Sequence, residues 1–251
     1  SDEEFQVAQE KLKKLSDYYD SIVVGQSKLK FALVSSLLAD GHILIESVPG
    51  LAKTTAAKTI ADAVFGSFSR IQCTPDLLPS DIVGTEVYNA QTGKFDTTFG
   101  PVFANFVLLD EVNRSSAKTQ SAMLEAMQEM QVTIGGTTYK MPDDVFMVIA
   151  TENPIEQEGT YNLPEAELDR FLIKVLVDYP SQQEEIQIVK TAGKAAEIPV
   201  KKVLSAEKIK TLQELLDQVV CDEKIVEYIV SIVSVTRTVS TDTRKSDISK
   251  Y

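Results

Sequence analysis

The stretch that decides the fold is His42–Thr55, with the sequence HILIESVPGLAKTT. It begins with the apolar run His42–Glu46 and then reaches Pro49-Gly50, which is the pattern of a buried strand followed by a turn. The alanine-rich segment Thr54–Phe65 predicts a helix directly afterwards. Such a strand, turn and helix can hold an anion, because backbone N–H groups of the turn and of the helix N-terminus point toward it.

The loop residues that are candidate nucleotide contacts are Ser47, Val48, Pro49, Gly50, Leu51, Ala52, Lys53, Thr54 and Thr55. In a phosphate loop, the Lys53 ammonium reaches the β- and γ-phosphates, and the Thr54 hydroxyl binds Mg²⁺. The strict pattern G-x-x-x-x-G-K-[ST] has glycines where this chain has Ser47 and Ala52. Ala52 adds one methyl group, whereas Ser47 is the larger concern if its position needs a backbone angle reserved for glycine. Alone, the segment fits a nucleotide loop and an ordinary strand-to-helix turn equally well.

A second apolar run ends in two acids. Phe106–Leu109 are followed directly by Asp110 and Glu111. A buried parallel strand brings its last residues to the sheet edge where open α/β folds bind ligands. There the Asp110 carboxylate can hold the water shell of Mg²⁺, and the Glu111 carboxylate can polarise an attacking water. Two solvated acids are the alternative, but we favour the functional interpretation because the pair lies downstream of Lys53 and Thr54.

The remaining apolar runs predict the fold class. Phe146–Ala150 and Phe171–Val177 indicate further buried strands, and Ser116–Met130 indicates a helix. Strands that alternate with helices predict an α/β fold, in which helices cover both faces of a parallel sheet. Asn153 follows one of these strands, where its amide can orient a water or touch the γ-phosphate. A turn started by Asn-Pro is the alternative.

Helices and hairpins accompany this sheet. Apolar spacing predicts leading helices over Phe5–Tyr19 and Gln26–Ala39. Thr85–Phe99 predicts a hairpin-like insertion, and Val132–Tyr139 predicts a second hairpin. The second one turns at Gly135-Gly136, since glycines suit the positive φ angles of a two-residue turn.

The strand patterns stop after Tyr179-Pro180, and only helical patterns follow. We therefore expect two domains: residues 1–180 with the sheet, and residues 181–251 as a small helical domain.

Composition narrows the function classes. Of 251 residues, 25 are lysine or arginine and 37 are aspartate or glutamate, a net charge of -12. An acidic chain repels nucleic-acid phosphates, which argues against non-specific nucleic-acid binding. No apolar run approaches the ~18 residues of a membrane span and no signal-peptide pattern opens the chain, so we expect a cytoplasmic protein without a membrane partner. Because His42 is the only histidine, a hydrolase of this composition must activate water with a carboxylate or a metal ion.

Taken in their order, these motifs resemble the MoxR branch of the AAA+ ATPases over nearly the whole chain to about Asp178. The segments that carry the resemblance are Val23–Gln26, His42–Thr54, Gln72–Asp81, Gly100–Asn105, Asp110–Arg114, Ala150–Asn153 and Leu163–Phe171. Their joint order is specific, although no single segment is. The resemblance implies a P-loop αβα nucleotide domain, a helical lid, ATP and Mg²⁺ as ligands, and a ring-shaped homo-oligomer, commonly a hexamer.

The resemblance also implies roles for particular residues. Lys53 and Thr54 become the phosphate and magnesium residues, and Asp110 becomes the second magnesium anchor. Glu111 becomes the catalytic carboxylate. Asn153 becomes the first sensor, on a strand that the family places between the phosphate-loop strand and the Asp110 strand.

Two further sites follow from the resemblance. Arg170 matches the arginine finger, which reaches the γ-phosphate held by a neighbouring subunit with a permanently charged, bidentate group. A surface ion pair with Asp169 or Glu167 is the alternative. Val24 and Gly25 would lie against adenine.

The insertions and departures of this chain leave some points open. In related rings, hairpins like Thr85–Phe99 and the one at Gly135-Gly136 point toward the pore or partner surfaces; the alternative is that they cap sheet edges. Arg114 is either a charge sensor between subunits or part of a structural ion pair. Ser47 stands where the family usually has glycine. A Ser-Pro-Arg-like segment with the second sensor is missing before Tyr251, so we expect the lid to be incomplete.

These features predict a cytoplasmic ATPase whose hydrolysis of ATP drives the remodelling or assembly of client proteins, including metal-cofactor insertion in some relatives. The first alternative is a nucleic-acid-dependent motor, which DNA-stimulated hydrolysis would reveal. The second is a phosphotransferase that acts on a small metabolite. The third is a nucleotide-gated interaction protein with negligible turnover, which Ser47 keeps open.

Overall fold

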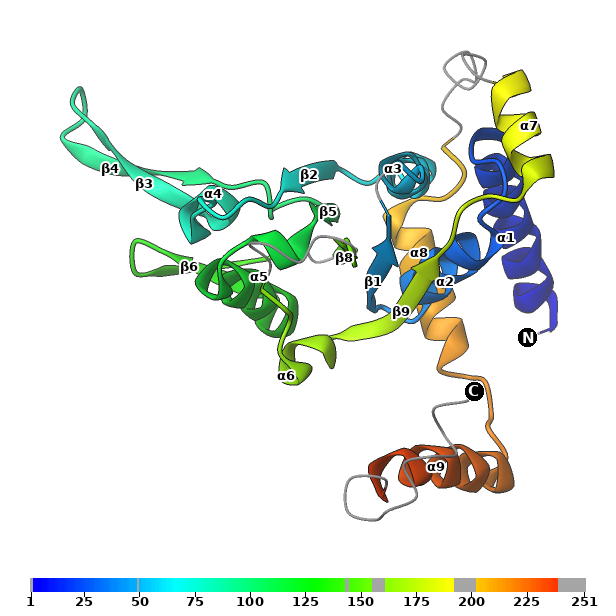
Figure 1. Ribbon diagram of the computed structural model, residues 1–251. Coiled ribbons are helices and arrows are strands. Elements are labelled where there is room, and N and C mark those ends of the chain that lie inside the picture. Colours follow the sequence, from blue (N-terminus) through cyan, green and yellow to red (C-terminus); the bar gives the residue numbers. More distant parts are fainter. Residues whose placement is uncertain (1, 49, 143–144, 155–160, 192–201, 239–251) are drawn as a thin grey trace. The chain divides into compact units, whose positions relative to one another are not determined.

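The computed structural model describes residues 2–48, 50–142, 145–154, 161–191 and 202–238 (Figure 1). It divides the chain into two compact units, Ser1–Glu214 and Leu215–Tyr251. The expected domains, residues 1–180 and 181–251, stay a prediction. None of the helices within the described ranges is both long enough and apolar enough to cross a membrane.

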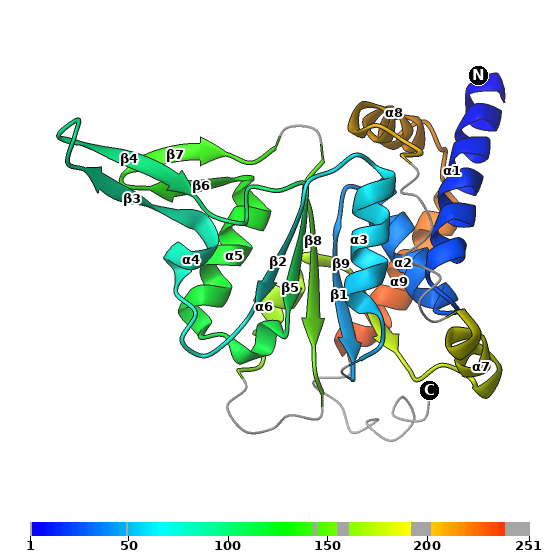
Figure 2. The same ribbon diagram turned by 90° about the horizontal axis from the view of Figure 1, so that it is seen from above.

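A five-stranded sheet forms the centre of the first unit, with the strand order β2-β5-β8-β1-β9. Its strands are β1 (His42–Ser47), β2 (Phe68–Gln72), β5 (Phe106–Asp110), β8 (Met147–Glu152) and β9 (Phe171–Val177). Every neighbouring pair is parallel, and Figure 2 shows β1 and β8 running side by side in the same direction. The carboxyl ends of all five strands therefore meet at one edge, and the predicted α/β fold is confirmed.

The central strands form because their side chains are apolar on both faces. Ile43, Leu44 and Ile45 of β1 are fully buried, as are Val148 and Ile149 of β8. Burying one such side chain stabilises the fold by about 1.5–3 kcal/mol. The edge strand β2 differs, because only Ile71 among its residues is buried. Its alternating polar pattern explains why the apolar runs did not predict it.

Helices cover both faces of this sheet. The leading helices are α1 (Asp2–Ile22) and α2 (Ser27–Leu38), and α3 (Lys53–Ala63) follows the loop after β1. Figure 1 shows α3 and α5 (Ala117–Glu129) on opposite sides of the sheet. Helix α5 contributes Met123, Leu124 and Met127 to the core, which they share with β5 and β8 side chains. The predicted helices are thus confirmed to within a few residues.

Two hairpins lie outside the central sheet. The first pairs β3 (Gly84–Asn89) with β4 (Lys94–Phe99), and the second pairs β6 (Gln131–Ile134) with β7 (Thr137–Lys140). In the second, Gly135 and Gly136 have φ angles of 55° and 83°, as the sequence predicted. The hairpins contact each other: the hydroxyls of Thr97 and Tyr139 lie 2.9 Å apart, and the Phe99 ring packs edge-on against Tyr139.

The remaining elements are short or lie toward the C-terminus. They are α4 (Pro79–Val83), the 3-10 helix η1 (Val112–Arg114), α6 (Glu165–Leu168), α7 (Gln182–Thr191), α8 (Ala206–Leu216) and α9 (Glu223–Thr238). The second unit contains α9, whose described apolar side chains, such as Ile229 and Ile232, are exposed.

Candidate functional site

The loop between β1 and α3 has the geometry of an anion-binding turn. Gly50 has a φ of 88°. Ala52 is the N-cap of α3 in the left-handed conformation, with φ 53° and ψ 18°. Because Ala52 makes no side-chain capping hydrogen bond, first-turn N–H groups stay available for a ligand. Pro49 lies outside the described residues.

Ser47 does not have the backbone angle that would require glycine. It is the buried last residue of β1, and its φ is not positive. The non-glycine residue of this loop with a positive φ is Ala52, which from the pattern was the smaller concern of the two. A residue with a Cβ atom pays a conformational penalty at that position.

Lys53 directly follows the loop and has two carboxylates nearby. It is the first residue of α3 and only 9% of its surface is exposed. Burial lowers the pKa of the Lys53 ammonium, while the charges of Asp110 and Glu111 act in the opposite direction. The structure therefore brings together the lysine from one motif and the acids from another.

The Asp110 carboxylate at the end of β5 has two partners that the sequence analysis did not identify. The Thr151 hydroxyl donates to Asp110 Oδ1 at 2.9 Å. On the other oxygen, the Arg70 guanidinium of β2 forms an ion pair and donates from both Nε and Nη2. These partners come from the strands on either side of β5, so only the sheet register reveals them.

Glu111 occupies a strained position next to Asp110. Its φ is 58°, and its backbone N–H donates to the Thr151 hydroxyl at 2.8 Å. Its carboxylate accepts from Gln72 Nε2 at 3.2 Å and from Arg114 at 3.1 Å. A left-handed non-glycine residue is costly and persists where the surroundings hold it. Of the two interpretations of Arg114, the structure shows the ion pair, with Glu111 as its partner.

Asn153 follows β8 and is buried. Since β8 lies between β5 and β1, the expected position of the strand before Asn153 is confirmed. The Asn113 amide donates to the Asn153 backbone oxygen at 3.4 Å. Because it follows the end of β8, Asn153 lies at the carboxyl edge of the sheet, where Ser47 and Asp110 also lie.

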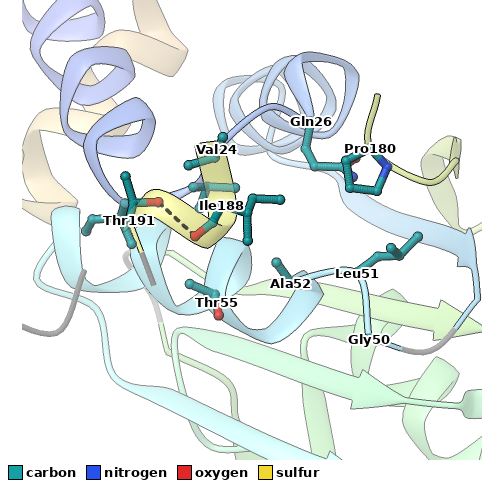
Figure 3. A pocket seen from close by; sticks show the side chains of 11 residues that line it. Val24, Gln26, Gly50, Leu51, Ala52, Thr55, Pro180, Ile188 and Thr191 are labelled. Carbon is teal, nitrogen blue, oxygen red and sulfur yellow. Dashed lines mark hydrogen bonds between the residues drawn. The ribbon is translucent and has the colours of Figure 1, made fainter. Parts of the chain in front are cut away.

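An apolar pocket of about 250 Å³ lies beside the loop (Figure 3). Its lining residues are Ile22, Val23, Val24, Gln26, Gly50, Leu51, Ala52, Thr55, Pro180, Ile188 and Thr191. Val24, one of the two residues expected against adenine, is among these lining residues. Gly25 (φ 71°) lies against α7, where a Cβ atom would collide with Glu184.

Sequence reasoning missed the contribution of α7 to this pocket. Ile188 and Thr191 come from α7, and Pro180 precedes that helix. Their spacing of three residues on one helix was the available signal, but it did not indicate which surface the helix would face.

The donor set suits Mg²⁺ bound together with phosphates. Thr54 follows Lys53 in the first turn of α3, and Asp110 supplies a carboxylate that is 13% exposed. Within the described ranges, no three His, Cys, Asp or Glu residues cluster as a metal site of their own. Mg²⁺ is commonly held by one or two protein groups plus phosphate oxygens and water, so these residues fit it.

Arg170 does not join this group within one chain. It precedes β9, whose first residue Phe171 pairs with His42 at the start of β1. Arg170 therefore lies at the amino edge of the sheet, whereas Asp110 lies at the carboxyl edge. The structure describes Arg170, Asp169 and Glu167, and no ion pair links Arg170 to either acid. Burial raises the pKa of Glu167, and the Arg170 charge opposes this shift.

Comparisons with known proteins agree with this architecture. The family model of the ATPase family associated with various cellular activities (AAA) matches residues 42–173. Chaperone MoxR1 of Mycobacterium tuberculosis is 50% identical over 216 residues, which are 86% of this chain and 57% of that protein. YeaC of Bacillus subtilis, which is uncharacterised, is 45% identical over 227 residues, or 90% of this chain and 71% of YeaC. The chain thus spans little more than half the length of MoxR1.

A solved structure supports the same likeness. The crystal structure of a proposed ATPase from Cytophaga hutchinsonii superimposes with a TM-score of 0.81 at 43% identity. The match covers 93% of this chain and 73% of that one.

Proposed function

Because the chain belongs to the AAA family of ATPases, and within it to the MoxR type, we propose that it binds ATP with Mg²⁺ and hydrolyses it in a ring-shaped homo-oligomer, commonly a hexamer in this family. The hydrolysis drives the remodelling or assembly of client proteins, with metal-cofactor insertion as one form of that work. A cytoplasmic location is part of this proposal.

One observation carries the proposal: the buried Lys53 ammonium, the Asp110 and Glu111 carboxylates and an apolar pocket converge at one edge of the sheet. The pocket suits an adenine ring, since its lining is largely apolar and Val24 and Gln26 also offer backbone groups. The loop and the α3 N-terminus suit the phosphates. Adjacent apolar and cationic sites are what a nucleoside triphosphate requires.

Each side chain has a defined part in this chemistry. Lys53 offsets the phosphate charge, and Thr54 and Asp110 hold the metal. Mg²⁺, when bound, neutralises charge that develops on the phosphate oxygens. Glu111 orients and deprotonates the attacking water, and Asn153 holds that water in place.

Binding of a fluorescent ATP analogue tests the proposal. Lys53→Ala removes the cation that meets the phosphates, so we expect it to lose tight binding. Lys58→Ala is the matched control, because Lys58 is an exposed lysine of the same helix. If Lys53→Ala binds as the parent does, the phosphate-loop assignment is wrong. DNA-stimulated hydrolysis would instead favour a nucleic-acid motor.

A further inference from the structure

Arg70 and the proposed Mg²⁺ would both bind the Asp110 carboxylate. Arg70 donates two N–H groups to Asp110 Oδ2, and Thr151 already occupies Oδ1. Both oxygens of the proposed magnesium anchor thus have partners within the protein. A guanidinium and a divalent cation that share one carboxylate repel each other, and the repulsion is stronger where water is scarce. The Asp110 side chain is only 13% exposed, so solvent screens that repulsion weakly.

We propose that Arg70 is the resident counter-ion of Asp110 in the nucleotide-free protein and that Mg²⁺ must displace it, so that Arg70 sets how much the metal strengthens nucleotide binding. This inference rests on the proposed function. Arg70 is a positioning residue here, because it acts through Asp110.

The surroundings of Arg70 make this displacement feasible. Its side chain is 48% exposed, so the guanidinium can move into solvent while the metal compensates the charge of the largely buried Asp110 carboxylate. Arg70 also donates to Gln72 Oε1 at 3.1 Å, and Gln72 in turn donates to Glu111. The side chain therefore keeps a second partner on β2 after it leaves Asp110, and it stays near the phosphate site.

The measurement is the dissociation constant of ADP carrying an N-methylanthraniloyl fluorophore, determined with EDTA and with saturating Mg²⁺. The dissociation constant with EDTA divided by the constant with Mg²⁺ gives a ratio that reports how much the metal strengthens nucleotide binding. Arg70→Met keeps the length of the stem and removes the charge. We expect the ratio to rise at least about fivefold, the lower end of usual coupling between two sites. Arg70→Lys, which keeps a charge but loses the two-donor geometry, should lie between parent and Arg70→Met.

Lys174→Met is the matched control. Lys174 is 44% exposed. It forms ion pairs with Glu46 of β1 and Glu152 of β8, but not with Asp110. We expect its ratio to remain that of the parent. In the background Asp110→Asn, Arg70→Met should no longer change the ratio, because the shared partner is gone.

The outcomes separate the inference from the proposed function. An unchanged ratio in Arg70→Met, an equal rise in Lys174→Met, or a rise that persists with Asp110→Asn overturns the inference alone. A change in thermal stability without a change in the ratio also overturns it, since that is the signature of a purely structural ion pair. A parent protein that binds no nucleotide under either condition overturns the proposed function and this inference with it.

Discussion

At the scale of single residues, Ala52 adopts the backbone angle that glycine would adopt without a penalty. Its φ of 53° is left-handed, whereas Ser47 continues the strand β1. The strict phosphate-loop pattern has glycine at both places, so the pattern alone could not tell which of the two substitutions strains the loop. The backbone angles make that distinction.

The loop prediction compares two substitutions to glycine in nucleotide-free protein. Ala52→Gly relieves the left-handed strain and should raise the free energy of unfolding by about 1 kcal/mol. Ser47→Gly only increases the conformational freedom of the unfolded chain and should lower the free energy of unfolding by roughly 0.5–1 kcal/mol. Urea denaturation measures both. The reverse order of the two effects would contradict the loop geometry.

The second prediction at this scale concerns how the buried imidazole of His42 makes stability depend on pH. Its Nδ1 accepts from the Val148 N–H at 3.1 Å, and burial lowers its pKa below 6.5, opposed by a hydrogen bond with the Met127 backbone and by Asp40. The unfolded chain therefore takes up this proton at a higher pH than the folded chain. The stability that His42 contributes is fully present above about pH 6.5 and is lost as the pH falls toward its folded pKa.

Replacing His42 by glutamine removes this titration and keeps an acceptor for Val148. Between about pH 7.5 and pH 5.5, we expect the free energy of unfolding of His42→Gln to fall less than that of the parent. Because the chain has one histidine, no other imidazole obscures the comparison. Parallel pH profiles for the two proteins would show that His42 is not buried in its neutral form.

At the scale of elements, the sequence identified those strands that are apolar on both faces. The runs at His42, Phe106 and Phe171 became β1, β5 and β9 with nearly the predicted bounds. The edge strand β2 was missed, and with it Arg70 and its contact with Asp110. Contacts between strands depend on register, which a local apolar pattern does not contain.

The base of the β3–β4 hairpin gives the element-scale prediction. A Cβ atom on Gly100 would meet the backbone of Ile82 and Gly84, which cannot move aside like a side chain. We expect Gly100→Ala to lower the free energy of unfolding by at least about 2 kcal/mol.

Gly93→Ala, near the tip of the same hairpin, is the control for that substitution. Gly93 has a φ of 67° and open space around it, so alanine there should cost only about 1 kcal/mol of backbone strain. Equal losses in thermal or urea denaturation would argue that the close backbone approach at Gly100 has no energetic weight.

At the scale of the whole molecule, Arg170 is separated from the nucleotide site of its own chain by the length of β9. Seven residues of strand span roughly 20 Å. A finger at this place can act only on a neighbouring subunit. The resemblance implied that Arg170 acts on a neighbouring subunit, and the direction of β9 in the sheet gives the physical reason for its separation from the site of its own chain.

Mixing two inactive variants tests a shared site. Arg170→Ala should bind ATP and lose hydrolysis by on the order of 10³-fold or more, whereas Lys53→Ala should lose binding and keep its finger. Together, under conditions that allow subunits to exchange, they should recover part of the activity. Normal hydrolysis by Arg170→Ala, or active monomers, would contradict the role of a finger.

The central claim is that Glu111 and Lys53 belong to one ATP-hydrolysing site, and the most direct measurement is ATP binding and steady-state hydrolysis by Glu111→Gln beside the parent. We predict parent-like affinity with turnover at least ~100-fold slower, because glutamine preserves the shape of the side chain and cannot take the proton. Turnover by Glu111→Gln at the parent rate, or a parent that binds ATP and Mg²⁺ without hydrolysing it, would contradict the account.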